Sequence, residues 1–149
     1  MPTVRLIVPS RFEIVEELTL LIERITEQMH FDSDDRDNIV IAVTEAVSNA
    51  IIHGNRNDQE KKVQISIVTS DKKITIRVKD EGEGFDPNKL ASPLEPNNIL
   101  KENGRGIFIL HSLMDKVKFD FSAGGTEVIM TKYKKPLQKS RKSLTLRTI

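Results

Sequence analysis

The sequence contains no cysteine, no tryptophan and only one tyrosine. The absence of cysteine excludes disulfides, thiol nucleophiles and cysteine-ligated zinc, and it suits the reducing environment of a cytoplasm. Aromatic residues make up only 5% of the chain. We therefore expect a hydrophobic core that consists mainly of isoleucine, valine and leucine side chains.

Long apolar runs are missing as well. No stretch approaches the roughly 18 apolar residues of a membrane-spanning helix. The N-terminal segment MPTVRLIVPSRFEIVEE reaches acidic residues too early for a signal peptide. We therefore expect a cytoplasmic protein with no membrane partner. The length of 149 residues predicts one domain rather than two.

Charge is unevenly distributed along the chain. The formal net charge is +1, but residues 134–149 contain six basic and no acidic side chains. The remaining residues contain 17 basic and 22 acidic side chains, which gives them a net charge near −5. A basic tail can contact nucleic acid or an acidic partner, but the acidic body and the lack of stacking aromatics argue against nucleic acid. We expect residues 134–149 to be a disordered tail and residues 1–133 to form the domain.

Hydrophobic spacing predicts the element order β-α-α-β-β-loop-α-β-β. Two hairpins dominate, and helices and strands do not alternate singly. This pattern predicts an α/β fold, a two-layer sandwich in which helices cover one face of a mixed, mostly antiparallel sheet. Candidate N-caps of the first two helices are Ser10 and either Asp32 or Ser33. The expected elements are a strand at 3–8, helices at 12–29 and 32–52, a hairpin at 63–79, a mobile loop at 86–104, a helix at 107–114 and a hairpin at 116–134.

The second expected helix carries a polar row beside an apolar stripe. Glu45, Asn49 and His53 are spaced four residues apart, so they stack on one helical face. An Asn amide oxygen suits Mg²⁺, which otherwise keeps water and phosphate oxygens, and a neighbouring carboxylate can orient a nucleophile or accept its proton. Taken alone, a solvated helix face explains this row better. The stripe that should be buried consists of Ile39, Val43, Ala46, Val47 and Ala50.

A carboxylate follows the third expected strand. Asp80 precedes Gly82 and Gly84 in the segment VKDEGEGFDP. A carboxylate at a strand end can accept a hydrogen bond from the amino group of adenine, and glycine allows the backbone to approach a ligand closely. A plain acidic turn is the alternative interpretation of this segment.

Two glycines, Gly104 and Gly106, open the third expected helix and flank Arg105. Backbone N–H groups at a helix start bind anions, and Arg105 can add a charge-assisted contact to a phosphate. Thr126 follows a second glycine pair, and its hydroxyl can bond adenine directly or through water. A glycine-broken helix entry and an ordinary hairpin are the local alternatives.

Other nucleotide and metal motifs are absent from the sequence. There is no G-x-x-x-x-G-K-[ST] P-loop, and both glycine pairs lack the third glycine of G-x-G-x-x-G. No H-R-D or D-F-G set marks a eukaryotic-type protein kinase. His30, His53 and His111 show no zinc-ligand spacing.

Together and in this order, the four motifs resemble the Bergerat-fold ATPases, the superfamily that includes the ATP domains of type II topoisomerases and histidine kinases. Within it, the chain is most similar to bacterial anti-sigma factor serine/threonine kinases of the sporulation and general-stress type. The similarity covers about residues 3–133 and is carried by TEAVSNAIIHGN, KDEGEGFDP and GRGIFILHSLMD.

The resemblance implies ATP with Mg²⁺ as cofactors and assigns the site residues. Glu45 is the implied catalytic base, Asn49 the ligand of Mg²⁺ on ATP, and Asp80 the ligand of adenine. Residues 87–103 would form a lid over ATP. The other implied nucleotide-binding residues are His53, Gly82, Gly84, Phe85, Gly104, Arg105, Gly106, Ile107 and Thr126.

The resemblance also implies partners. Such kinases transfer the γ-phosphate of ATP to a Ser or Thr of a STAS-domain anti-sigma antagonist, and they otherwise sequester a sigma factor. A homodimer is expected, with the N-terminal strand and the first helix as candidate surfaces. The alternative hypothesis is an ATP- or ADP-binding switch module that acts by binding partners without kinase activity.

Overall fold

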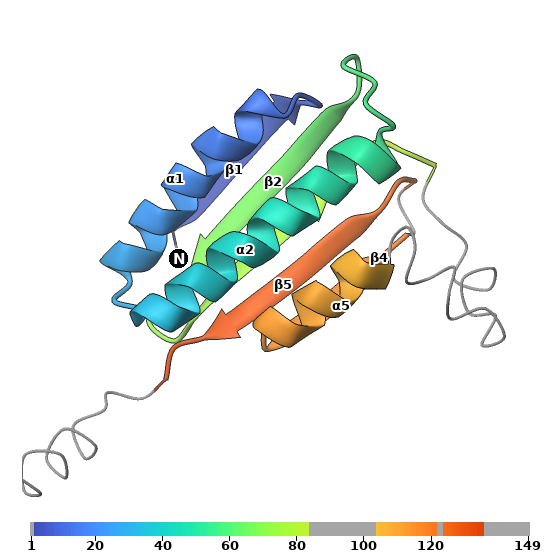
Figure 1. The fold of residues 1–149 in the computed structure, drawn as a ribbon. Helices are drawn as coiled ribbons and strands as arrows, with labels where there is room; N and C mark the ends of the chain where they lie inside the picture. The colour runs from blue at the N-terminus through green and yellow to red at the C-terminus, as the bar shows by residue number, and fades with distance from the viewer. Residues whose placement is uncertain (1, 84–103, 122–123, 136–149) are drawn as a thin grey trace, which may run out of the picture.

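The computed structural model describes residues 2–83, 104–121 and 124–135 (Figure 1). The predicted element order is confirmed in these residues. None of the described helices is both long and apolar enough to cross a membrane. The elements are β1 (Thr3–Pro9), α1 (Glu13–Gln28), α2 (Ser33–Asn49), the π-helical turn η1 (Ala50–Gly54), β2 (Lys62–Thr69), β3 (Lys73–Lys79), α5 (Gly104–Leu113), β4 (Lys116–Asp120) and β5 (Glu127–Tyr133).

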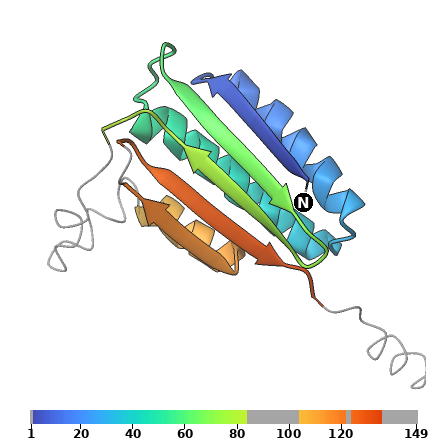
Figure 2. The same ribbon diagram turned by 180° about the vertical axis from the view of Figure 1, so that it is seen from behind.

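The five strands form one sheet with the order β1-β2-β3-β5-β4, and every described pair is antiparallel. The three helices cover one face of this sheet, and the other face is open (Figures 1 and 2). The predicted two-layer sandwich is therefore confirmed. The sheet is antiparallel throughout in the described part, rather than mixed. Because β5 lies between β3 and β4, the end of β3 meets the start of β5, where Lys79 pairs with Glu127.

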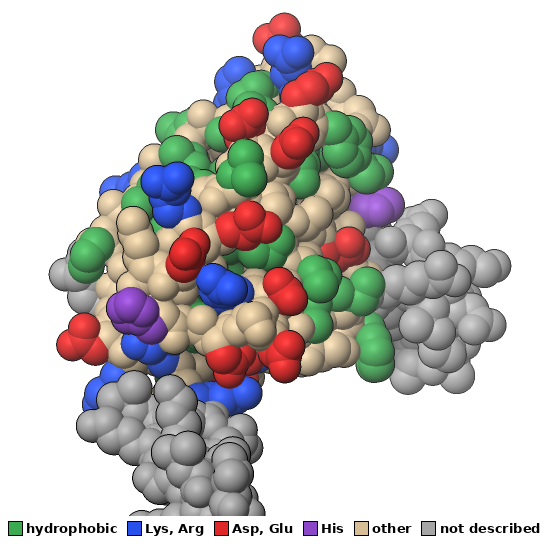
Figure 3. All heavy atoms as spheres, turned by 60° about the vertical axis from the view of Figure 1, so that its left-hand side comes forward, with side chains coloured by type: hydrophobic (Ala, Val, Ile, Leu, Met, Phe, Trp, Pro, Cys, Tyr) green, Lys and Arg blue, Asp and Glu red, His purple; other side chains and the backbone are tan. Residues whose placement is uncertain are grey.

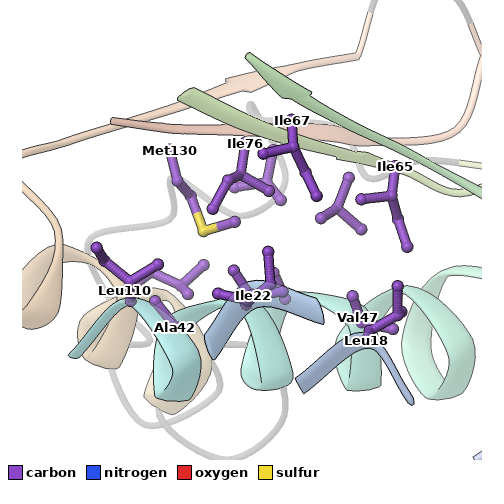
Figure 4. Close-up of a cluster of buried hydrophobic side chains, with 14 of the residues drawn as sticks. Leu18, Ile22, Ala42, Val47, Ile65, Ile67, Ile76, Leu110 and Met130 are labelled. Atoms are coloured by element: carbon purple, nitrogen blue, oxygen red, sulfur yellow. The ribbon is translucent and has the colours of Figure 1, made fainter. Parts of the chain in front are cut away.

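The core fills the space between the two layers. Ile65, Ile67, Ile76 and Met130 of the sheet face Leu18, Ile22, Ala42, Val47 and Leu110 of the helices (Figure 4). Phe31 is the one aromatic ring among the buried core residues of the described part. Each fully buried isoleucine stabilises the fold by about 1.5–3 kcal/mol relative to an exposed one, so aliphatic packing suffices without aromatics. The predicted stripe of α2 is confirmed, since Ile39, Val43, Ala46, Val47 and Ala50 are all buried.

The helix starts match the predictions only in part. Asp32 caps α2 as expected, because its side chain accepts a 2.8 Å hydrogen bond from the backbone N–H of Asp35. The predicted cap by Ser10 is wrong. Phe12 occupies the N-cap position of α1 without a side-chain bond, and the Ser10 hydroxyl instead donates to the carbonyl oxygen of Lys61 at 2.7 Å. The third helix begins at Gly104, three residues before the predicted start at 107.

Candidate functional site

A pocket of about 450 Å³ opens between the end of α2, the start of α5 and the adjoining ends of β3 and β5. Its wall is apolar and polar in about equal parts, with polar side chains from α2, η1 and the end of β3 among apolar ones. This combination is typical of small-molecule sites. The apolar lining residues are Ala46, Ala50, Ile52, Val78, Ile107, Leu110, Phe119 and Val128, and the others are Asn49, His53, Gly54, Arg56, Asp80, Glu83 and Thr126.

Asp80 lies at one end of this pocket and is only 5% exposed. Its Oδ1 accepts hydrogen bonds from the backbone N–H groups of Gly82 at 2.9 Å and Thr126 at 3.0 Å. Its Oδ2 accepts no hydrogen bond from another described residue, so this oxygen is left for a ligand. Burial raises the pKa of the Asp80 carboxyl, and the two N–H donors and the charge of Lys61 oppose this effect without cancelling it.

Three glycines surround Asp80 and leave no room for side chains. A Cβ at Gly125 would lie 3.0 Å from Oδ1, and one at Gly54 would collide with the carboxylate. A Cβ at Gly82 would collide with the carbonyl oxygen of Gly54. Gly125 also has φ +73, which favours glycine. The sequence predicted Gly82 as a site residue but missed Gly54 and Gly125.

Glu45 and Asn49 lie one turn apart on α2 and meet the start of α5. A Cβ at Gly106 would lie 2.7 Å from Oε1 of Glu45 and closer still to Nδ2 of Asn49. Gly106 therefore brings the backbone of α5 directly onto the polar row of α2. Glu45 and Asn49 are half-buried, and neither side chain makes a hydrogen bond to another described residue. The amide oxygen of Asn49 is the kind of ligand that could hold Mg²⁺, which needs few protein ligands when it is carried by phosphate oxygens and water.

The continuous helix predicted up to residue 52 is wrong in its last turn. The hydrogen-bond pattern widens after Asn49 into η1, which ends when the N–H of Asn55 donates to the carbonyl oxygen of Ala50 at 2.8 Å. Such π-turns recur at functional sites because they redirect the side chains that follow. His53 lies in this turn, is exposed and lines the pocket, so the even four-residue stacking holds only for Glu45 and Asn49.

The remaining predicted residues divide into two groups. Ile107 and Thr126 line the pocket, and Thr126 reaches Asp80 through its backbone N–H. Gly104 and Arg105 lie in the first turn of α5. Gly84 and Phe85, the segment 87–103 predicted as a lid, and the tail from residue 136 lie outside the described residues.

Sequence analysis missed Asn55, a fully buried side chain beside the pocket. Its Nδ2 donates to the Ser10 hydroxyl at 2.8 Å and to the carbonyl oxygen of Lys62 at 3.0 Å. Its Oδ1 accepts from the N–H of Glu81 at 2.7 Å. Asn55 therefore ties the start of β2 and the segment after β1 to the residue that follows Asp80. Its only sequence signal is a polar residue directly after the His53-Gly54 pair, in a stretch that reads as loop.

A family model of the histidine kinase-like ATPase domain matches residues 8–132 of the chain. The serine-protein kinase RsbW of Oceanobacillus iheyensis is 30% identical over 132 residues, which are 85% of this chain and 83% of that protein. RsbW of Bacillus subtilis is 31% identical over 85% of this chain and 82% of its own length. RsbW of Bacillus cereus is 32% identical over 85% of this chain and 81% of its own length.

A solved structure shares the fold. The crystal structure of the RsbU and RsbW domains of Rv1364c from Mycobacterium tuberculosis superposes with a TM-score of 0.65 at 18% identity. The match covers 91% of this chain and 34% of that longer one. It supports the architecture alone, whereas the family model and the sequence relatives confirm the predicted family. This chain belongs to the family of histidine kinase-like ATPase domains and, within it, to the RsbW-type serine-protein kinases.

Proposed function

We propose that this chain is an ATP-dependent serine/threonine-protein kinase that acts as an anti-sigma factor. The observation that carries the proposal is the arrangement of one pocket. Asp80 and Asn49 both line this pocket, and Glu45 and Gly106 lie directly beside Asn49. An apolar wall between a base-binding carboxylate and a helix start suits a nucleoside triphosphate.

The adenine base occupies the end of the pocket at Asp80. Oδ2 accepts a hydrogen bond from the exocyclic amino group of adenine, and Oδ1 stays bound to the N–H groups of Gly82 and Thr126. These two donors keep the carboxylate charged and oriented despite its burial. The apolar residues Ala50 and Val78 line the space in which the ring lies.

The phosphates reach the end at Asn49 and α5. Asn49 would hold Mg²⁺ through its amide oxygen, and the ion would neutralise part of the phosphate charge. The γ-phosphate is held by backbone N–H groups in the first turn of α5, which contains Gly104, Arg105, Gly106 and the pocket-lining Ile107. Phosphoryl transfer depends mainly on such positioning and charge neutralisation.

Glu45 acts on the acceptor hydroxyl. The seryl or threonyl oxygen forms a bond to the γ-phosphorus, and the bond from that phosphorus to the bridging oxygen breaks, so that ADP leaves with the electron pair. Glu45 orients the hydroxyl and accepts its proton. Support comes from its carboxylate, which is half-buried beside Gly106 and unpaired among the described residues.

Membership of the family supports a proposal for the partners. The acceptor is a STAS-domain antagonist, and a sigma factor is bound in the alternative complex. We also expect a homodimer formed through β1 and α1. β1 is an edge strand, and Ile7, Phe12 and Leu20 are 71%, 50% and 57% exposed. On the side of the molecule that carries α1, hydrophobic side chains lie among acidic ones (Figure 3).

A phosphate-transfer assay tests the proposal. The chain is incubated with γ-labelled Mg·ATP and a purified STAS-domain protein encoded beside its gene, and label on that protein is measured. Glu45→Ala should bind ATP as the wild type does but transfer no label. Glu60→Ala, an exposed carboxylate outside the pocket, is the control and should transfer normally. Transfer by Glu45→Ala at the wild-type rate would disprove the role of Glu45, and ATP binding by the wild type without transfer would favour the switch module.

A further inference from the structure

Arg56 and Asn57, which follow η1, adopt a backbone conformation that side chains rarely take. Their φ angles are 52° and 59°, in the left-handed region. Steric contact between Cβ and the backbone makes this region unfavourable for an arginine, whereas asparagine tolerates it better. Residues held in such conformations cluster at functional sites.

Hydrogen bonds hold this turn in place. The N–H of Asn55 donates to Ala50 and the N–H of Asn57 donates to Ile51, each at 2.8 Å, and the buried Asn55 side chain anchors the same turn. The two left-handed residues differ in their position relative to the pocket. Arg56 lines the pocket, and Asn57 does not.

Arg56 lines the same pocket as Asp80. It follows Gly54 by two residues, and Gly54 packs directly against the Asp80 carboxylate. The side chain of Arg56 is exposed and forms no ion pair with another described residue. A planar guanidinium with no other partner is suited to lie flat on an aromatic ring.

We propose that Arg56 stacks its guanidinium group on the adenine base that Asp80 binds, and so increases the affinity for adenine nucleotides. This inference rests on the proposed ATP binding. Asp80 accepts a hydrogen bond from the edge of the adenine ring. The apolar residues of the pocket contact one face of the ring, and Arg56 covers the other face, which points toward the pocket opening. Arg56 lines the pocket from a backbone position with a φ of 52°.

Binding measurements with two ligands test the contact. Arg56→Ala should weaken the binding of both ATP and adenosine by the same factor, about 3- to 30-fold. Arg56→Lys should weaken both nearly as much, because lysine keeps the charge but lacks the planar group. If only ATP binding falls, or if Arg56→Lys restores full affinity, Arg56 contacts phosphate and the stacking proposal is overturned.

A matched pair of glycine variants separates binding from folding. Arg56→Gly and Asn57→Gly each place glycine, which adopts positive φ without steric strain, at a left-handed position. Neither variant should therefore have a lower Tm than the wild type. Arg56→Gly should nevertheless bind ATP and adenosine as weakly as Arg56→Ala, whereas Asn57→Gly should bind them as the wild type does. Equal affinity of Arg56→Gly and the wild type would overturn the proposal.

The same experiment distinguishes this inference from the proposed function. A wild-type chain that binds neither ATP nor adenosine contradicts ATP binding itself. A wild-type chain that binds both, with Arg56 variants of unchanged affinity, leaves the kinase proposal intact and removes only the role of Arg56.

Discussion

Thr126 and Asp80 are joined by two reciprocal hydrogen bonds of 3.0 Å. The N–H of Thr126 donates to Oδ1 of Asp80, and the N–H of Asp80 donates to the carbonyl oxygen of Thr126. This pair exists because β5 inserts beside β3, although 46 residues separate the two partners in the sequence. The sheet topology thereby fixes Oδ1 of Asp80, whereas Oδ2 accepts no hydrogen bond from another described residue.

Asp80→Asn should separate ligand binding from stability. The oxygen of the asparagine side chain can still accept hydrogen bonds from the N–H groups of Gly82 and Thr126. Its amide nitrogen, however, takes the place of Oδ2 and would set a donor against the amino group of adenine. We expect ATP affinity to fall about 10- to 100-fold. The ligand-free variant should be as stable as the wild type or more stable at pH 7, because burial raises the pKa of Asp80 and the folded state disfavours its charge. Calorimetric titration and thermal unfolding measure the two effects, and wild-type affinity would contradict the role of Asp80.

Adenosine affinity should depend on pH through Asp80. Its pKa lies above the ordinary value of 3.8, so the carboxyl gains a proton at a higher pH than an exposed aspartate does. The proton removes an acceptor from the adenine amino group, and binding should weaken as the pH falls from 7 toward this raised pKa. Adenosine is the suitable ligand because phosphate groups titrate themselves near pH ~6. An affinity that stays constant down to the ordinary carboxyl range would argue against the contact.

Gly106→Ala should abolish phosphate transfer. Its Cβ would overlap Nδ2 of Asn49 and lie 2.7 Å from Oε1 of Glu45, so the ends of these two side chains must leave their positions. We expect a loss of about 1–3 kcal/mol in the free energy of unfolding together with loss of transfer. Gly124→Ala is the control, because its Cβ meets no atom within 4 Å and only its φ of +70 is strained. That variant should lose about 1 kcal/mol and keep full transfer.

The sequence predicted the parts of the site that depend on local spacing. Glu45 and Asn49 share a helix face because four residues make about one turn, and Asp80 with Gly82 follows a strand of alternating pattern. The layers of the fold were predictable for the same reason, since periods of two and 3.6 residues repeat along the chain. These features need no knowledge of which segments meet.

Other features depend on contacts between distant segments, and sequence analysis missed them. Gly54 and Gly125 matter only because η1 and the turn before β5 both close on Asp80. Ser10 has the chemistry of a helix cap, but the nearby Lys61 carbonyl and Asn55 amide take its hydrogen bonds. The π-turn and the left-handed Arg56 result from packing, which local propensity does not encode.

Asn55→Ala should destabilise the fold more than any surface substitution in the same turn. It removes three hydrogen bonds and leaves the N–H of Glu81 and the carbonyl oxygen of Lys62 without this buried partner. We expect a loss of about 2–4 kcal/mol in the free energy of unfolding, measured by urea denaturation. Asn57→Ala, an exposed neighbour, should lose about 1 kcal/mol or less. Equal losses in the two variants would mean that the Asn55 network contributes little.

Lys132→Met should destabilise the fold without affecting nucleotide binding. The ammonium of Lys132 is 11% exposed and lies 3.7 Å from Oδ1 of Asp35 and 3.6 Å from Oδ1 of Asp115, and it donates to the carbonyl oxygen of Leu113 at 2.8 Å. Removing it leaves the buried Asp35 carboxylate, among the described residues, with only the exposed Lys135, whose ammonium lies 3.7 Å from Oδ2, and this should cost about 2–4 kcal/mol.

The double variant Asp35→Asn with Lys132→Met should recover part of this loss, since it removes the uncompensated buried charge along with its partner. ATP affinity should stay at the wild-type value in both variants, because Lys132 lies at the end of β5 opposite Thr126. Urea denaturation and nucleotide titration on the same samples measure both quantities. A fall in ATP affinity in the single variant, at a temperature where it remains folded, would show that the two ends of the sheet are coupled.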